Sequence, residues 1–123
     1  MAETKDYITN TLENGTVNIN DEVIATIAAA AVKDVEGVVN LNGNLSDELS
    51  GMLGRKNSNK GIRVTLTEDA VEMECNLVVL YGHSVVEIAK NVQSCVTNAI
   101  ESMTGLKVRF VDVNIVGISM SKA

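Results

Sequence analysis

The chain has 123 residues, of which 46% are hydrophobic and 2% aromatic, and its formal net charge is −6. This length and apolar fraction predict one domain with an aliphatic core. The acidic balance argues against a general nucleic-acid binder, because phosphate neutralisation needs a basic face. The scarcity of aromatic residues argues against base-stacking platforms and aromatic cages.

The first 14 residues are polar and follow no period, so we expect residues 1–14 to be a poorly ordered lead-in. The remainder, 15–123, is expected to form a single α+β domain. The lead-in lacks the apolar core of a signal peptide, and no apolar run reaches the roughly 20 residues that span a bilayer. We therefore expect a cytoplasmic protein without a membrane-spanning segment.

The first half of this domain predicts a strand, a helix and a second strand. In residues 15–20 apolar and polar side chains alternate, as in a short strand. Two acidic residues follow Asn20, and apolar residues then recur three and four apart until Gly37, which predicts a capped helix. Residues 38–41 predict a brief extended piece, and residues 46–54 predict a short helical turn.

The second half predicts a β-hairpin followed by a long helix. Residues 61–80 alternate on both sides of a turn at Glu68-Asp69, as in a hairpin. From 77 to 80 both faces are apolar, which predicts cover on two sides or a contact. Ser84, with a glutamate three residues later, is a capping box, and Gly105 fits the left-handed position that ends a helix.

In the final strand, the apolar residues switch from one face to the other near the middle. Its apolar residues share one face up to Phe110 and the other face from Val111 onward. A β-bulge near these two residues would reconcile the halves, whereas an unbulged strand would need a partner chain. Together the elements predict an α+β fold in which two main helices pack on a small mixed or antiparallel sheet. The expected order is β-α-β-(short helical turn)-β-β-α-β.

The only histidine, His83, lies between Gly82 and Ser84 just before the long helix. A glycine at a helix N-terminus can support anion binding, but the same pattern makes an ordinary strand-to-helix turn. No neighbouring carboxylate pairs with the histidine for general base catalysis. Cys75 and Cys95 occupy apolar positions where reduced, buried thiols are expected, and their spacing from His83 matches no standard zinc site. We expect no catalytic residue, metal or cofactor.

Basic residues concentrate in one loop. Four of the ten lysines and arginines lie within nine positions, namely Arg55, Lys56, Lys60 and Arg63. The ordinary interpretation is a solvated loop. The sharper interpretation is an electrostatic contact for an acidic partner, a neighbouring subunit or a lipid headgroup surface. The loop is too small to form a nucleic-acid groove.

An ordered set of stretches resembles the alkaline shock protein family, the small cytoplasmic envelope-stress proteins of Gram-positive bacteria. These stretches are GTVNI (15–19), VIATIA (23–28), VEGV (35–38), KGIRV (60–64), Val92-Gln93, MTGLKV (103–108) and VDVNIVGI (111–118). They cover nearly everything after residue 14. No single motif is diagnostic, but the order of the set is fairly specific.

The resemblance implies a non-enzymatic protein that acts in cell-envelope homeostasis or stress tolerance. It implies that some relatives self-assemble and are held at the membrane by a small integral anchor protein. Others are linked to lipid or fatty-acid metabolism. The family has no established catalytic residues, so none is transferred to this chain.

Three hypotheses follow. The first is a cytoplasmic scaffold that self-assembles into a homo-oligomer, with assembly surfaces at Leu80 and Phe110, or docks to a partner. A partner such as a small membrane-anchor protein would hold it at the inner face of the membrane. The second is a regulator that binds a lipid or fatty-acid biosynthetic enzyme through the basic loop 55–63. The third is a small-ligand or anion binder at residues 82–84.

Overall fold

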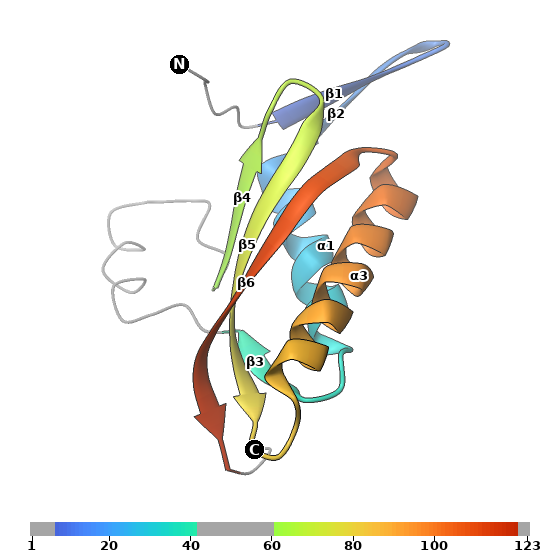
Figure 1. Ribbon diagram of the computed structural model, residues 1–123. Helices are drawn as coiled ribbons and strands as arrows, with labels where there is room; N and C mark the ends of the chain where they lie inside the picture. The colour runs from blue at the N-terminus through green and yellow to red at the C-terminus, as the bar shows by residue number, and fades with distance from the viewer. Residues whose placement is uncertain (1–6, 42–60, 121–123) are drawn as a thin grey trace, which may run out of the picture.

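The computed structural model describes residues 7–41 and 61–120. In these residues, two helices cover one face of a four-stranded sheet, and a separate two-stranded hairpin stands at one end (Figure 1). The elements are β1 (Tyr7–Leu12), β2 (Gly15–Asn20), α1 (Asp21–Lys33), β3 (Val38–Leu41), β4 (Ile62–Leu66), β5 (Ala70–Leu80), α3 (Val85–Thr104) and β6 (Lys107–Ser119). This confirms the predicted α+β class. The helical turn predicted over 46–54 lies outside the described residues.

The central strand of the sheet is β5. On one side it pairs antiparallel with two strands, β4 along its first half and β3 near its end. On the other side it pairs in parallel with β6. Parallel neighbours need a crossover, and α3 provides it by running back across the sheet (Figure 1). The predicted hairpin over 61–80 is confirmed as β4 and β5.

The expected lead-in over 1–14 is wrong for residues 7–14. β1 pairs with β2 in continuous antiparallel register from Tyr7–Asn20 to Leu12–Gly15. Ile8 is buried to 2% exposure, so the base of this hairpin is held by the core. Its sequence signals are a run rich in Tyr, Ile and Thr and the turn-forming Asn14-Gly15 that follows.

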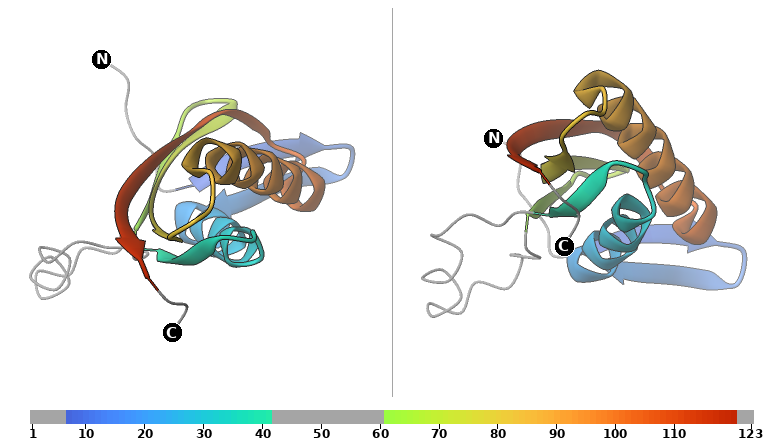
Figure 2. Two further views of the ribbon diagram at one scale, coloured as in Figure 1. Left: turned by 60° about the horizontal axis from the view of Figure 1, so that its bottom comes forward. Right: turned by 90° about the horizontal axis from the view of Figure 1, so that it is seen from below.

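The core lies between the sheet and the two helices, which Figure 2 shows packed side by side on the same face. From α3 it takes one row of residues four apart, and from α1 it takes a thinner, alanine-rich row. Because only this row of α3 is covered, the prediction that Cys95 is buried is wrong, whereas Cys75 in β5 is fully buried. The buried helical residues are Ile24, Ala25, Ala28, Val32, Ile88, Val92, Val96 and Ile100.

The predicted bulge in β6 is present, one residue earlier than expected. Val108 lies opposite Val71 and Phe110 lies opposite Glu72, so Arg109 is the extra residue. The shift brings Val108 and Val111 to the helix side, where both are buried. A partner chain on the second face of β6 is therefore not needed to explain its sequence.

Candidate interaction surfaces

Gly82, His83 and Ser84 form the turn between β5 and α3, and all three are exposed. The Ser84 hydroxyl accepts the backbone N–H of Glu87 at 3.2 Å, which confirms the predicted helix cap. The His83 N–H donates to the Leu80 carbonyl across the turn at 3.4 Å. In the described part of the chain, no three His, Cys, Asp or Glu side chains gather as they would around a metal. An anion site in this turn stays an untested prediction.

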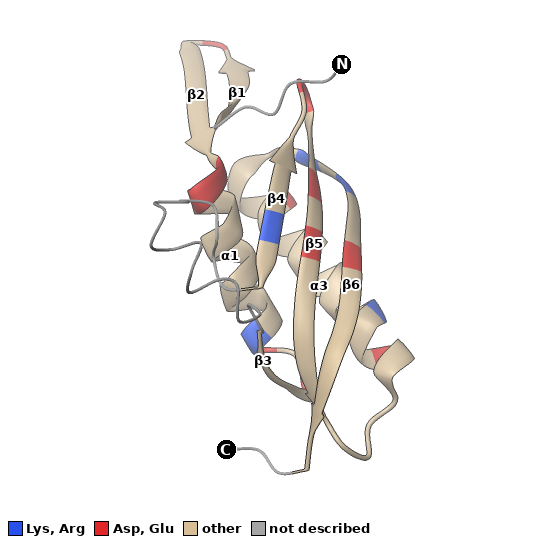
Figure 3. Ribbon diagram, turned by 90° about the vertical axis from the view of Figure 1, so that its left-hand side faces the viewer, with Lys and Arg blue, Asp and Glu red and all other residues tan. Residues whose placement is uncertain are grey.

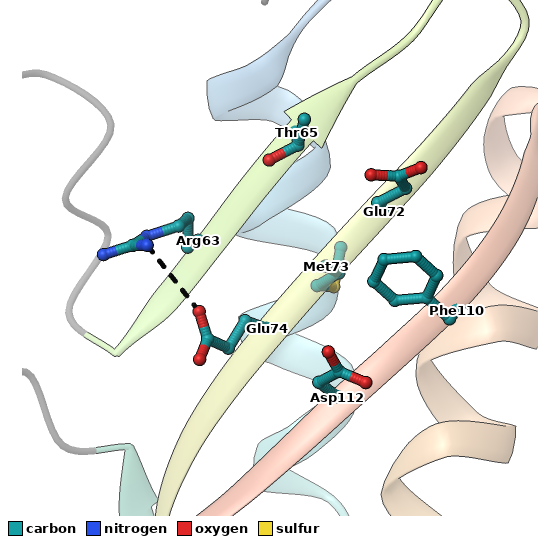
Figure 4. A pocket seen from close by; sticks show the side chains of 7 residues that line it. All are labelled: Arg63, Thr65, Glu72, Met73, Glu74, Phe110 and Asp112. Carbon is teal, nitrogen blue, oxygen red and sulfur yellow. Dashed lines mark ion pairs between the residues drawn. The ribbon is translucent and has the colours of Figure 1, made fainter.

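A shallow hollow of about 190 Å³ lies on the sheet face that is turned away from the helices. Figure 3 shows this face, where acidic positions on β5 and β6 lie beside a basic position on β4. Figure 4 shows the lining side chains, which are Arg63, Thr65, Glu72, Met73, Glu74, Phe110 and Asp112.

Both glutamates of the hollow already contact side chains on neighbouring strands. Arg109 Nη1 lies 2.8 Å from Glu72 Oε2, and Arg63 Nη1 lies 3.8 Å from Glu74 Oε1. Asn114 Nδ2 donates to Glu74 Oε2 at 2.8 Å and also to an asparagine of β5 at 2.9 Å. These contacts join β4, β5 and β6. The polar residues of this face therefore have a structural role as cross-strand side-chain pairs.

The basic loop is only partly visible. Arg55, Lys56 and Lys60 lie outside the described residues. Arg63 stands at the start of β4 with 76% of its side chain exposed, and its ion pair with Glu74 is long at 3.8 Å. Surface pairs of this kind contribute little to stability, so Arg63 is open to other anions. A joint surface of the four basic residues stays a prediction.

The structure does not bring Leu80 and Phe110 together. Phe110 lies opposite Glu72 on the outer face and is 45% exposed. Leu80 lies eight residues further along β5, which at the rise of a strand is about 26 Å away. Leu80 is partly exposed. Each stays a separate candidate contact, and no single assembly surface contains both.

Sequence reasoning missed the exposed apolar side chains at the two ends of the molecule. At the hairpin end, beside the last turn of α3, these are Tyr7, Leu12, Val17, Val23 and Met103 (Figure 1). At the opposite end, where β5 and β6 finish and α3 begins, these are Tyr81, Val85, Val86, Val116, Ile118 and Met120. Val23, Val85 and Met103 continue the apolar periods of their helices, so the sequence pattern does not distinguish them from buried positions.

The outer edge of β6 is covered in part by α3. The Gln93 side-chain amide donates to the Val111 carbonyl at 3.0 Å. The Val108 N–H donates to Glu101 Oε2 at 3.1 Å. An exposed strand edge invites pairing with another chain, and side chains that satisfy its backbone groups discourage such pairing.

Residues 9–120 match the alkaline shock protein 23 family, which is described as having a cell envelope-related function. The chain belongs to this alkaline shock family. The match confirms the resemblance to alkaline shock proteins that the sequence predicts. It spans β1 to β6, so the β1–β2 hairpin lies within the family region apart from its first two residues.

Curated relatives agree with this assignment. The chain is 34% identical over 104 residues to a Bacillus subtilis (strain 168) protein named "Uncharacterized protein YqhY", covering 85% of this chain and 77% of that protein. It is 29% identical over 125 residues to the "Stress response regulator gls24 homolog" of Streptococcus pyogenes serotype M3, covering 94% of this chain and 68% of the relative. Among solved structures, "MamM CTD H264E" aligns with a TM-score of 0.49 and 12% identity over 78% of this chain and 93% of that chain.

Two further properties of this alkaline shock family chain bear on its chemistry. Burial, together with the nearby Glu74 carboxylate, raises the pKa of the Cys75 thiol to about 12. This thiol stays protonated at neutral pH and is a poor nucleophile. Neither described helix combines the length and the apolar character needed to cross a bilayer.

Proposed function

We propose that this alkaline shock family chain is a non-enzymatic scaffold of the cell-envelope stress response, which acts by self-assembly or by docking to a partner. The observation that carries the proposal is the grouping of exposed apolar side chains at the two ends of the sheet. The family supplies the cellular process, because its described function is related to the cell envelope. The relative named as a stress response regulator supports the stress context.

Single exposed apolar residues are normal on a soluble protein, but groups of them mark contact surfaces. At the β6 end, Ile118 is 57% exposed beside Val79 in the sheet register. The Tyr81 N–H donates to the Ser119 carbonyl at 2.8 Å, which holds the start of the α3 turn against the end of β6. Tyr81 itself is 64% exposed. Apolar side chains from β6 and from the β5–α3 turn therefore lie near one another at this end.

We place the scaffold in the cytoplasm, and we propose that it reaches the inner face of the membrane through a partner such as a small membrane-anchor protein. Both cysteines are free thiols, as expected in a reducing compartment. Affinity purification of the tagged full chain from its native cell, with and without detergent, tests this placement. Recovery of a membrane protein only in detergent is the expected result. Recovery of the chain alone under both conditions would remove the docking half of the proposal.

A second candidate function is regulation of a lipid or fatty-acid biosynthetic enzyme through the basic loop 55–63. The exposed side chain of Arg63, with its long ion pair, favours it. Charge reversal in R55E/K56E/K60E should then abolish capture of the enzyme while the circular dichroism spectrum stays unchanged. Equal capture by the variant and the native chain would exclude the loop as the docking site.

A further inference from the structure

The β1–β2 hairpin is a sheet of its own that projects beyond the body of the molecule. Among the residues that the structure describes, its two strands pair only with each other, and neither outer edge has a strand partner there. Figures 1 and 2 show it extending past the ends of the helices and the main sheet. A two-stranded ribbon of this kind is marginally stable in water unless something packs against it.

The described contacts anchor the hairpin at its base and middle and leave its tip in solvent. Ile8 is buried and Ile19 is partly buried against the core, and Asn10 Nδ2 donates to the carbonyl of Thr104 at 3.2 Å. In the register of the hairpin, Leu12 and Val17 share the face of Ile8 but lie nearer the tip. They are 54% and 42% exposed. An apolar face therefore runs from the core out into solvent.

The hairpin also lacks the features by which sheets protect their edges. No charged residue and no proline occurs in Tyr7–Leu12 or Gly15–Asn20, and the register between them has no bulge. The edge of β6 differs, because it carries the charged Lys107, Arg109 and Asp112, two bulges and the covering side chains of α3. Unprotected edges of this kind pair with other strands.

We propose that the β1 edge of the hairpin pairs antiparallel with the β1 edge of a second copy, joining two hairpins into one four-stranded sheet. Two-fold antiparallel pairing sets residue i of one β1 against residue j of the other and j against i. In a strand of six residues, a charged side chain would therefore lie within a few residues of its own copy. The uncharged β1 avoids this, although the whole chain carries a charge of −6. We assign the pairing to β1 because β2 continues directly into α1 at Asp21. The inference rests on the proposed scaffold function and names its assembly surface.

Sedimentation velocity of the full chain over a concentration series tests the pairing. A lysine at Thr11, which is exposed on the polar face of β1, would place like charges across the new edge. We expect T11K to raise the dissociation constant of the dimer by about tenfold or more. S94K adds the same charge to the exposed face of α3 and should leave the constant unchanged. Both variants should keep the melting temperature of the native chain.

A second measurement keeps the proposal falsifiable if T11K disturbs the hairpin. In a C95S background, T9C alone, T11C alone or a mixture of the two should give disulfide-linked dimers under mild oxidation, and T26C on α1 should not. If the native chain dimerises but T11K and S94K do not differ, and T9C and T11C do not cross-link, the hairpin inference fails and scaffold assembly stands. If the native chain is monomeric at every concentration, both the hairpin inference and self-assembly fail.

Discussion

At Gly37, one missing side chain allows the turn before β3 to lie close to α3. The backbone there has a φ of +97°, and an added Cβ would lie 2.7 Å from Ile88 Cδ1. Gly82 has a similar φ of +99°, but an added Cβ would have no atom within 4 Å. Comparing alanine substitutions at Gly37 and Gly82 therefore separates the free-energy cost of backbone strain from that of overpacking.

We predict that G37A lowers the free energy of unfolding by about 2–5 kcal/mol, because strain and overpacking add. The matched control G82A should lower it by about 1–2 kcal/mol through strain alone. Urea denaturation measures both. Equal losses in the two variants would contradict the close packing of the Gly37 turn on Ile88.

The two cysteines should differ in reactivity. Cys95 is exposed, whereas Cys75 is buried and the pKa of its thiol is raised from 9.0 to about 12. At pH 8 a thiol reagent should modify one cysteine per folded chain and both after denaturation. Because the raised pKa belongs to the folded state, protonation of Cys75 favours folding, and this contribution is lost as pH rises from about 9 towards 12. Rapid labelling of Cys75 in the folded chain would show that β5 is open.

At the scale of elements, the sequence predicted the features that depend on interactions between neighbouring residues. The Ser84 cap, the β4–β5 hairpin and the parity change in β6 are all readable from neighbouring residues. The β1 strand was missed because its sequence mixes Thr and Asn, which do not mark a strand by themselves. Whether this segment forms a strand depends on its pairing with β2. The sharing of one side of β5 by β3 and β4 depends on contacts distant in sequence, and no local pattern encodes it.

The bond between Glu101 and the edge of β6 gives an element-scale prediction. Glu101 Oε2 accepts the Val108 N–H at 3.1 Å, and its loss leaves that backbone donor without this partner. We predict that E101A lowers the free energy of unfolding by about 1–2 kcal/mol, whereas E101Q keeps an acceptor oxygen and loses less. Chemical denaturation of both variants measures the difference. An E101A variant as stable as E101Q would mean that water replaces the carboxylate.

At the scale of the whole molecule, the sequence predicted the family and the fold class but not the surfaces. Leu80 and Phe110 were expected to serve assembly, and they lie far apart on the sheet. The exposed groups at the two ends emerge only in three dimensions, because the ends of α3 and β6 extend past the elements that cover their middles. The hairpin end and the β6 end therefore replace a single patch as the candidate contact surfaces of the scaffold.

Light scattering of the purified full chain over a concentration series tests the proposed self-assembly most directly. A scaffold that assembles through its exposed ends should show a weight-average mass that rises with concentration above the 13.1 kDa of one chain. A mass that stays at 13.1 kDa up to high concentration, for a chain that also captures no partner from its native cell, would contradict the scaffold function.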